Sequence, residues 1–324
     1  MFQKYSLPFL QLLLTVIIFS GCESNQEATR VDLPANQQQW ARMDALFEEW
    51  KKGVPNGTGP YGVVREEPST LDTHTVFKPA KATTEKLPII AFANGGCRNT
   101  PIEFTAFLAE IVSHGYFVVA AGTIDVEFAV RDFSAMDKNG KPLQKVSRKV
   151  LTDAVDWAIR ENARQGSPYY NKLDTNKIAY MGQSCGGMQA LSASTDPRTT
   201  TTIVLNSGRF SGDRKPPAGG AFSEWFEWSE LHAPIAYFLG GPPDGNSGRK
   251  NFEEINRLPV FLADLPVGHT GAYPDPDLRW SAAVLAWLDW QLKNNEDNKT
   301  MFSGENCGLC TNKDWTVTGF KNPN

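Results

Sequence analysis

Short apolar runs alternate with longer amphipathic segments through most of this chain. The apolar runs predict strands, and the segments between them, whose apolar residues recur every three or four positions, predict helices. Strands are expected at residues 87–93, 116–121, 178–181, 202–206, 235–240 and 259–265, and helices at 102–114, 146–164, after Gly186, and at 251–256 and 278–293. Strands that are apolar throughout need cover on both faces, which is typical of parallel sheets. The pattern therefore predicts an α/β fold, with a mostly parallel central sheet and helices on both faces.

The ends of the chain follow this alternation less regularly. A helix is expected at residues 36–52, because its aromatic residues fall on one face at helical spacing. Short strand signals lie at 61–65 and 74–78. The C-terminal segment, 301–324, is expected to be irregular.

One insertion, at residues 208–233, separates two of the expected strands. It contains Pro-Pro and Gly-Gly steps, followed by Phe222, Trp225, Phe226 and Trp228. Loops that follow strand ends in such sheets surround the ligand crevice. The aromatic residues therefore belong either to a lid or acyl-binding wall, or to a surface helix that caps the core. The sequence leaves both interpretations open.

The first residues have the pattern of an export signal. Lys4 precedes an apolar run at residues 7–19, and the sequence Phe-Ser-Gly-Cys then ends at Cys22. A positive start, a short apolar core and small residues before a cleavage point are typical of a secretory signal peptide. The cysteine after Ser-Gly resembles a bacterial lipobox, which implies cleavage before Cys22 and lipidation of its thiol. An ordinary signal peptide with an incidental cysteine is the alternative.

The expected organisation is a lipoprotein signal peptide at residues 1–21, a polar tether at 22–35 and a single domain at 36–324. Lipid chains on Cys22 would hold that domain at a membrane surface without spanning it. The expected location is the bacterial cell envelope, at its periplasmic face or at the cell surface. A domain of this length can bury a substantial core.

The composition narrows the classes of partner. Lys and Arg number 32 and Asp and Glu number 36 in the 324 residues, so the formal net charge is −4. No basic cluster stands out, and nucleic acid is therefore not an expected partner. Hydrophobic residues make up 41% of the chain, which favours a folded globule over a disordered chain.

Four cysteines remain once Cys22 is set aside. An exported protein meets oxidising conditions, so Cys97, Cys185, Cys307 and Cys310 are expected to form two disulfides, with three connectivities open. Cys307 and Cys310 lie close enough in sequence to bridge locally. They lack a second Cys or His pair nearby, so no metal site is expected there.

The sequence Gly-Gln-Ser-Cys-Gly at residues 182–186 is the strongest candidate for chemistry. It reads G-x-S-x-G and stands between an expected strand and a segment of small, helix-compatible residues. A serine on such a sharp turn points its hydroxyl out of the sheet, and the flanking glycines tolerate the tight backbone. Ser184 is therefore the expected nucleophile.

A serine hydroxyl needs a base to remove its proton, and the base needs an acid to orient it. Of the four histidines, His269 directly follows the strand at 259–265 and is the expected base. Asp244 follows the strand at 235–240 and is the expected acid. Asp264 is the competitor, but it lies so close to His269 in sequence that it has little room to turn back on the imidazole.

An oxyanion hole needs two backbone N–H groups aimed at the carbonyl oxygen as it gains charge. The expected donors are Cys185, which follows the nucleophile, and either Gly96 or Cys97 in the loop after the strand at 87–93. If both loops converge on one oxygen, Cys97 and Cys185 lie near each other. A Cys97–Cys185 disulfide would then brace the oxyanion hole, and two separate buried thiols are the alternative.

Residues 87–293 resemble the α/β-hydrolase superfamily, and within it the secreted serine esterases that include chlorophyllase-like, cutinase-like and dienelactone-hydrolase-related enzymes. The resemblance is carried by the strand and loop at 88–96, the His-Gly-Tyr step at 114–116, the turn at Ser184 and the Gly-His pair at 268–269. The chain order Ser, Asp, His is also that of the superfamily. The resemblance implies ester cleavage through an acyl-enzyme, with no cofactor.

Three functions follow from these observations. The first is a lipid-anchored serine esterase that acts on small-molecule or polysaccharide-linked carboxylic esters. The second is a serine peptidase of the same fold, which is weaker because the sequence offers no obvious anionic cluster for a substrate amine. The third is a non-catalytic envelope lipoprotein that binds ligands. The complete set of Ser184, Asp244 and His269 argues against the third.

Overall fold

The computed structural model describes residues 45–124, 147–209, 225–242, 246–271 and 277–323. Contacts within the chain group Ala41–Asn324 into one compact unit. The expected signal peptide, the tether and Cys22 lie outside the described residues. Of the helix expected at 36–52, residues 45–52 are described, and they are helical.

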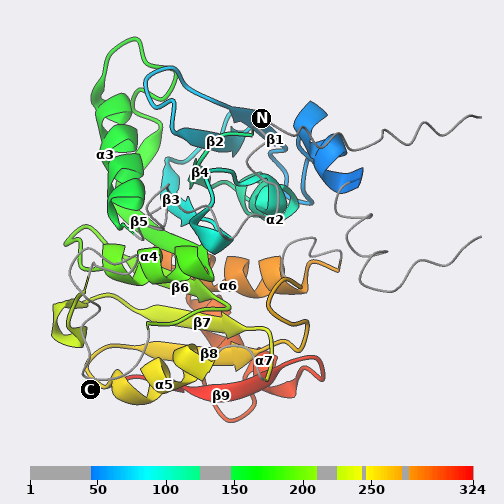
Figure 1. The fold of residues 1–324 in the computed structure, drawn as a ribbon, viewed down its shortest axis with the longest axis vertical. Coiled ribbons are helices and arrows are strands. Elements are labelled where there is room, and N and C mark those ends of the chain that lie inside the picture. Colours follow the sequence, from blue (N-terminus) through cyan, green and yellow to red (C-terminus); the bar gives the residue numbers. More distant parts are fainter. Residues whose placement is uncertain (1–44, 125–146, 210–224, 243–245, 272–276, 324) are drawn as a thin grey trace, which may run out of the picture. The chain divides into compact units, whose positions relative to one another are not determined.

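A nine-stranded sheet forms the centre of this unit (Figure 1). Its strands are β1 (Val63–Glu66), β2 (His74–Pro79), β3 (Leu87–Ala93), β4 (Phe117–Ala121), β5 (Leu173–Gln183), β6 (Thr201–Leu205), β7 (Ile235–Leu239), β8 (Val260–Asp264) and β9 (Thr316–Lys321). They lie in the order β1-β2-β4-β3-β5-β6-β7-β8-β9. The strands from β3 to β8 pair in parallel, whereas β1, β2 and β9 pair antiparallel at the edges. The predicted α/β class with a mostly parallel sheet is confirmed.

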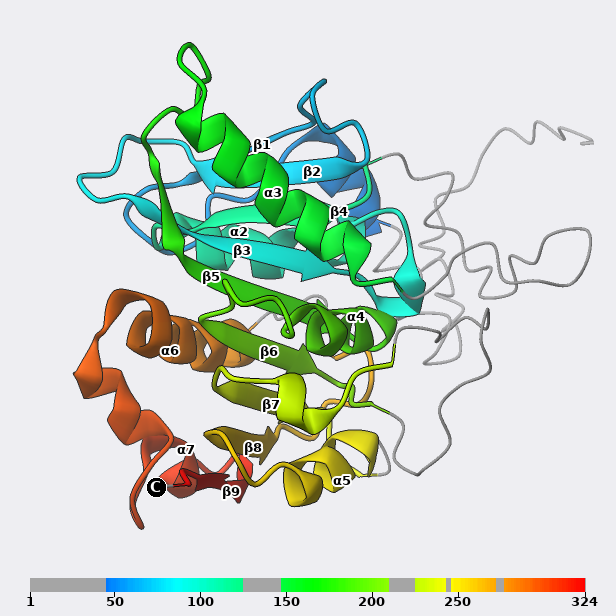
Figure 2. The same cartoon turned by 90° about the vertical axis from the view of Figure 1, so that its left-hand side faces the viewer.

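Helices cover both faces of the sheet (Figures 1 and 2). The α-helices after the first segment are α2 (Thr105–Ser113), α3 (Lys149–Ala163), α4 (Cys185–Ala193), α5 (Asn246–Glu254), α6 (Arg279–Lys293) and α7 (Gly308–Thr311). Short 3₁₀ turns are η1 (Gly95–Cys97), η2 (Ile102–Phe104), η4 (Trp228–Glu230) and η5 (Glu296–Met301). Helices α2 and α6 pack on one face, while α3, α4 and α5 pack on the other.

Strand β3 shows why its sequence is apolar at every position. Ile90 and Phe92 pack in the core beneath α2, whereas Ile89 and Ala91 pack in the core beneath α3. Successive side chains of a strand point to opposite faces, so a strand between two helical layers buries all of them. All seven residues of β3 are buried.

Two predictions about strands need correction. The segment at 301–324 is not irregular throughout, because Thr316–Lys321 forms β9 and pairs antiparallel with β8. Its side chains lie at an exposed sheet edge, so the sequence carries no apolar run there. Strand β5 begins at Leu173, earlier than expected, because residues 174–177 are polar and at least partly exposed and so do not extend the apolar run. The pairing of β5 with β3 shifts register in this stretch, between Pro88 and Ile89.

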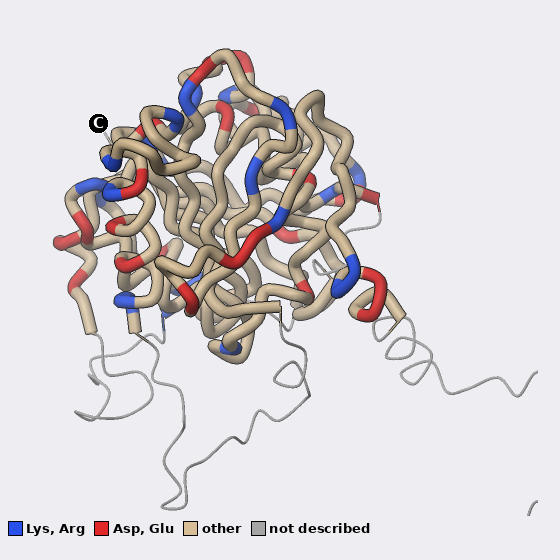
Figure 3. The backbone as a smooth tube through the Cα atoms, turned by 90° about the horizontal axis from the view of Figure 1, so that it is seen from above, with Lys and Arg blue, Asp and Glu red and all other residues tan. Residues whose placement is uncertain are grey.

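Charge is spread evenly over the described chain, and Figure 3 shows acidic and basic residues interspersed along it. No helix in the described ranges combines the length and the apolar character needed to cross a bilayer.

Candidate active site

Ser184 lies in the sharp turn between β5 and α4. Strand β5 runs into α4 at the carboxyl end of the parallel strands (Figure 1). The Ser184 backbone has φ 52° and ψ −118°, a conformation that is uncommon for a residue with a side chain. Hydrogen bonds hold this turn: the Ser184 N–H donates to the Leu205 carbonyl at 2.9 Å, and the Ser207 hydroxyl donates to the Ser184 carbonyl at 2.6 Å. The turn therefore has the strained strand-to-helix geometry that the G-x-S-x-G motif predicts.

The two glycines of the motif are required by close backbone contacts. A Cβ on Gly182 would lie 2.3 Å from the Gly186 carbonyl oxygen, and a Cβ on Gly186 would lie 2.0 Å from the Ala93 carbonyl oxygen. No side chain fits at such distances. The turn at residues 182–186, which we call the elbow, can therefore approach the end of β3 only with glycine at both positions.

His269 lies beside Ser184. Its Nε2 atom is 2.9 Å from the Ser184 Oγ, although the two residues are far apart in sequence. His269 follows β8, and its side chain is exposed to solvent. A histidine nitrogen at hydrogen-bond distance from a serine hydroxyl is the geometry that general-base activation requires.

The expected acid, Asp244, lies in the segment 243–245, outside the described residues. Its competitor, Asp264, is described: it ends β8, is buried, and forms an ion pair with Arg249. Asp264 therefore has a partner of its own on α5.

The structure gives two other histidines local partners. In His74, Nδ1 lies 2.9 Å from the Thr73 hydroxyl and Nε2 lies 2.8 Å from the Val150 carbonyl. Burial lowers the pKa of His74, and the Val150 carbonyl and Asp153 oppose this effect only in part. His114, at the end of α2, lies 3.0 Å from the Glu110 carboxylate. These contacts account for both residues as parts of the scaffold.

A disulfide joins Cys97 to Cys185, with Cα atoms 5.2 Å apart. The predicted pairing is therefore confirmed, and the loop after β3 lies against the start of α4. Gly96 and Cys97 have φ values of 61° and 50°, so this loop makes a left-handed turn as it passes the elbow. The second predicted bridge, Cys307–Cys310, is also present and closes a local turn.

The expected oxyanion donors lie on these two disulfide-linked segments. Cys185 is the first residue of α4, and the first N–H groups of a helix have no acceptor within the helix. The facing loop is held by Asn94, whose side-chain amide donates to the carbonyls of Ala121 at 2.6 Å and Arg98 at 2.9 Å.

Three polar residues around the site were not predicted from the sequence: Gln183, Asn206 and Ser207. Gln183 fills the first variable position of the G-x-S-x-G motif, and its side-chain amide donates to the His269 carbonyl at 2.9 Å. Asn206 follows β6 and donates to the same carbonyl at 2.8 Å. Polar residues at the carboxyl ends of apolar strands are a signal that could have identified them.

The insertion is described only in part, because residues 210–224, with Phe222, lie outside the described ranges. Phe226 is buried in the core beside α5, which fits the interpretation of a core cap. Trp225 and Trp228 remain partly exposed, and the Arg209 guanidinium lies over their rings, 4.4 Å and 3.8 Å from the centroids.

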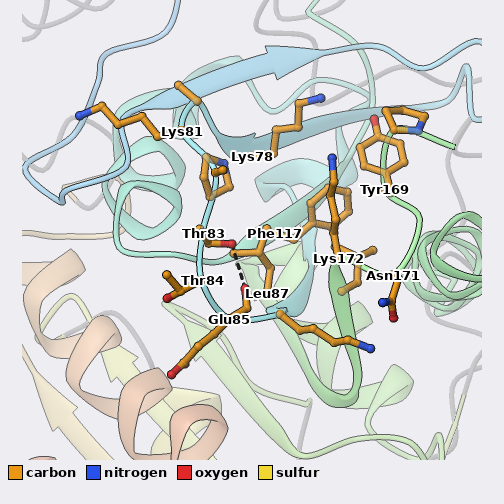
Figure 4. A pocket seen from close by; sticks show the side chains of 16 residues that line it. Lys78, Lys81, Thr83, Thr84, Glu85, Leu87, Phe117, Tyr169, Asn171 and Lys172 are labelled. Atoms are coloured by element: carbon orange, nitrogen blue, oxygen red, sulfur yellow. Dashed lines mark hydrogen bonds between the residues drawn. The ribbon is translucent and has the colours of Figure 1, made fainter.

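A pocket of about 410 Å³ lies near the amino ends of β3, β4 and β5 (Figure 4). Ser184 follows the carboxyl end of β5, so the pocket lies away from it. Its lining includes Lys78, Lys86 and Lys172, together with Tyr169. It is separate from the serine site. Within the described residues, no group of three or more His, Cys, Asp or Glu side chains is arranged to hold a metal ion.

Comparison with known proteins adds no family assignment: no protein-family model matches this chain, and no curated protein matches it significantly.

Proposed function

We propose that this protein is a serine hydrolase that cleaves carboxylic esters through an acyl-enzyme. The observation that carries the proposal is the 2.9 Å separation of the His269 Nε2 and the Ser184 Oγ on a strained strand-to-helix turn. The order of elements, with the nucleophile after β5 and the base after β8, supports an α/β-hydrolase fold. Asp244, after β7, is the proposed acid.

The proposed reaction has two halves. In the first, the Ser184 Oγ attacks the ester carbonyl carbon while its proton passes to the His269 Nε2. The carbonyl electron pair moves onto oxygen, and the resulting oxyanion accepts hydrogen bonds from the N–H of Cys185 and from that of Gly96 or Cys97. When this intermediate collapses, the C–O bond to the alcohol breaks, and His269 returns its proton to the departing alcohol.

The second half regenerates the enzyme. Water attacks the acyl carbon bound to Ser184, and His269 accepts a proton from that water. The bond from Ser184 to the acyl carbon then breaks, the serine oxygen regains its proton from His269, and a carboxylic acid leaves. No cofactor takes part in this scheme.

The proposed setting is the bacterial cell envelope. The export pattern and Cys22 support an N-terminal lipid anchor, and small-molecule or polysaccharide-linked esters are the proposed substrates. Loops that follow strand ends surround the ligand crevice in such sheets, and on that premise the partly exposed Trp225 and Trp228 of the insertion suit an apolar or aromatic acyl group.

The test is hydrolysis of p-nitrophenyl acetate and longer p-nitrophenyl esters by the purified protein and by Ser184→Ala. We expect the variant to lose activity by roughly three or more orders of magnitude, because only binding and oxyanion stabilisation remain. Ser194→Ala is the matched control, since the Ser194 hydroxyl donates only to carbonyls of its own helix, at 3.1 Å and 2.7 Å. Full activity in Ser184→Ala would contradict the proposal, and a preference for p-nitroanilides would favour the peptidase alternative.

A further inference from the structure

The backbone carbonyl of His269 accepts two hydrogen bonds from side-chain amides. The Gln183 Nε2 donates at 2.9 Å and the Asn206 Nδ2 donates at 2.8 Å. The Asn206 Nδ2 also lies 3.4 Å from the Gly268 carbonyl. A carbonyl oxygen has two lone pairs, so both donors can be accommodated at once. We call Gln183 and Asn206 together the amide clamp.

Both members of the amide clamp are fixed to the central sheet. Gln183 is the last residue of β5, opposite Leu205 of β6 in the strand register, and Asn206 follows directly after Leu205. The Asn206 N–H donates to the Phe238 carbonyl on β7 at 2.9 Å. Gln183 is 0% exposed and Asn206 is 2% exposed, so neither side chain is free to rotate in solvent.

Two features of Asn206 are energetically unfavourable: its backbone conformation and its buried side-chain oxygen. Its φ is 47°, in the left-handed region that asparagine tolerates better than most residues. Its Oδ1 is buried and has no hydrogen-bond partner among the described residues. The orientation of the amide is settled by its neighbours, because both atoms facing the Nδ2 are carbonyl oxygens that can only accept.

The loop that carries His269 is seated closely against the end of β7. The Gly268 N–H donates to the Gly240 carbonyl at 2.9 Å, and a Cβ on Gly240 would lie 2.3 Å from the Gly268 carbonyl oxygen. The imidazole itself is exposed to solvent. The backbone of this loop is therefore held by groups at the ends of the strands, while the His269 ring lies at hydrogen-bond distance from Ser184.

We propose that Gln183 and Asn206 are positioning residues that hold the His269 backbone so that its Nε2 stays within reach of the Ser184 Oγ. The role in catalysis rests on the proposed hydrolase function. Neither amide touches the reacting atoms, and the amide clamp acts on the main chain of the base. Because Gln183 precedes Ser184 directly, the segment that carries the nucleophile also binds the backbone of the base.

The test compares Gln183→Met, Asn206→Gly and the double variant with the wild type. Methionine keeps the length of glutamine without its donor, and glycine keeps the positive φ of position 206. Gln189→Met is the matched control, because Gln189 is also a buried glutamine but donates to the Ser147 carbonyl at 3.2 Å. Steady-state hydrolysis of p-nitrophenyl acetate gives kcat and KM, and hydrogen exchange followed by mass spectrometry reports on the peptide that covers residues 265–271.

We expect kcat to fall about 10-fold in each single variant and about 100-fold in the double variant, with KM changed less than about two-fold, because small misplacements of a catalytic group cost rate and not binding. Exchange in the peptide 265–271 is expected to become faster in the same order, and Gln189→Met should match the wild type in both measurements. If Asn206→Gly does not fold, the kcat and the hydrogen exchange of Gln183→Met alone test the positioning role.

A kcat in the double variant within two-fold of the wild type would overturn the positioning role, as would an equal fall in Gln189→Met. If the wild type hydrolyses no ester, the proposed function fails instead. Hydrogen exchange alone then tests whether the amide clamp holds the His269 backbone. Faster exchange at 265–271 in the variants than in the wild type supports this role, and unchanged exchange overturns it.

Discussion

Side-chain amides hold the backbone on both sides of Ser184. Asn94 fixes the loop after β3 through the carbonyls of Ala121 and Arg98, and Gln183 and Asn206 fix the loop that carries His269. Each of these amides is buried. Buried amides are stable only when hydrogen-bonded, so each such residue constrains the loop that it contacts.

The residues that carry the proposed chemistry could be predicted from the sequence, whereas the residues that position them could not. Ser184 stands in a motif with two obligatory glycines, and His269 follows a strand in a chain with few histidines. A polar residue at the end of an apolar strand marks Gln183 and Asn206 as candidates. Their positioning role is not visible in the sequence, because the partner is a backbone carbonyl whose position depends on the folded loop. Asp244 stays a prediction.

We expect His74 to make the stability of the folded protein depend on pH. Burial lowers the pKa of His74 below its ordinary value of 6.5, so the unfolded chain takes up this proton at a higher pH than the folded chain does. Between these two pKa values the unfolded state binds more protons, and stability falls as the pH is lowered below about 6.5. In His74→Gln this loss is absent, and the melting temperature should depend less on pH in that window. If the melting temperatures of the wild type and the variant change equally with pH, the lowered pKa of His74 is contradicted.

At the scale of elements, the Cys97–Cys185 disulfide joins η1 to the first residue of α4. It connects the two segments that carry the proposed oxyanion donors. The pairing could be predicted because both cysteines stand beside positions whose roles the sequence indicated. Strand β9 could not, because Thr316–Lys321 lies half exposed at the sheet edge and takes its conformation from pairing with β8.

The second prediction is that the two disulfides differ in importance. Removing Cys97–Cys185 in a double alanine variant opens a loop with a sequence separation of 88 and should reduce the free energy of unfolding by roughly 4.5 kcal/mol if the disulfide acts through chain entropy. It should also reduce kcat by about 10-fold or more with little change in KM, because the oxyanion donors lose their fixed spacing.

The matched control is the double alanine variant of Cys307 and Cys310, whose sequence separation is only 3. We expect it to lose less than about 2 kcal/mol and to keep its kcat. Denaturant unfolding and ester kinetics check both variants. Equal effects of the two pairs on kcat would show that the bridge at the elbow has no special role.

At the scale of the whole molecule, the parallel sheet brings together segments from distant parts of the chain. The loops after β3, β5 and β8 come together because the carboxyl ends of parallel strands lie at the same end of the sheet. The alternation of apolar runs and amphipathic segments was enough to predict this layered α/β architecture. Strand order and register depend on packing between segments, which one sequence does not display.

The third prediction concerns the proposed lipid anchor. When the full chain is produced in bacterial cells, it should partition into the detergent phase of a two-phase extraction and carry label from a radioactive fatty acid. Cys22→Ser should lose both properties, because a single thiol is the proposed attachment point. Gln26→Ala, a change within the expected tether, is the control. Detergent partitioning that persists in Cys22→Ser would contradict lipidation at this residue.

Covalent labelling tests most directly whether Ser184 is a nucleophile activated by His269. The protein is treated with a fluorophosphonate, which forms a stable adduct with activated serines, and the modified peptide is identified by mass spectrometry. We expect a single adduct on Ser184 in the wild type and a labelling rate reduced by about 100-fold or more in His269→Ala. An unlabelled Ser184 in the folded wild type, or an equal labelling rate in His269→Ala, would contradict this role of Ser184.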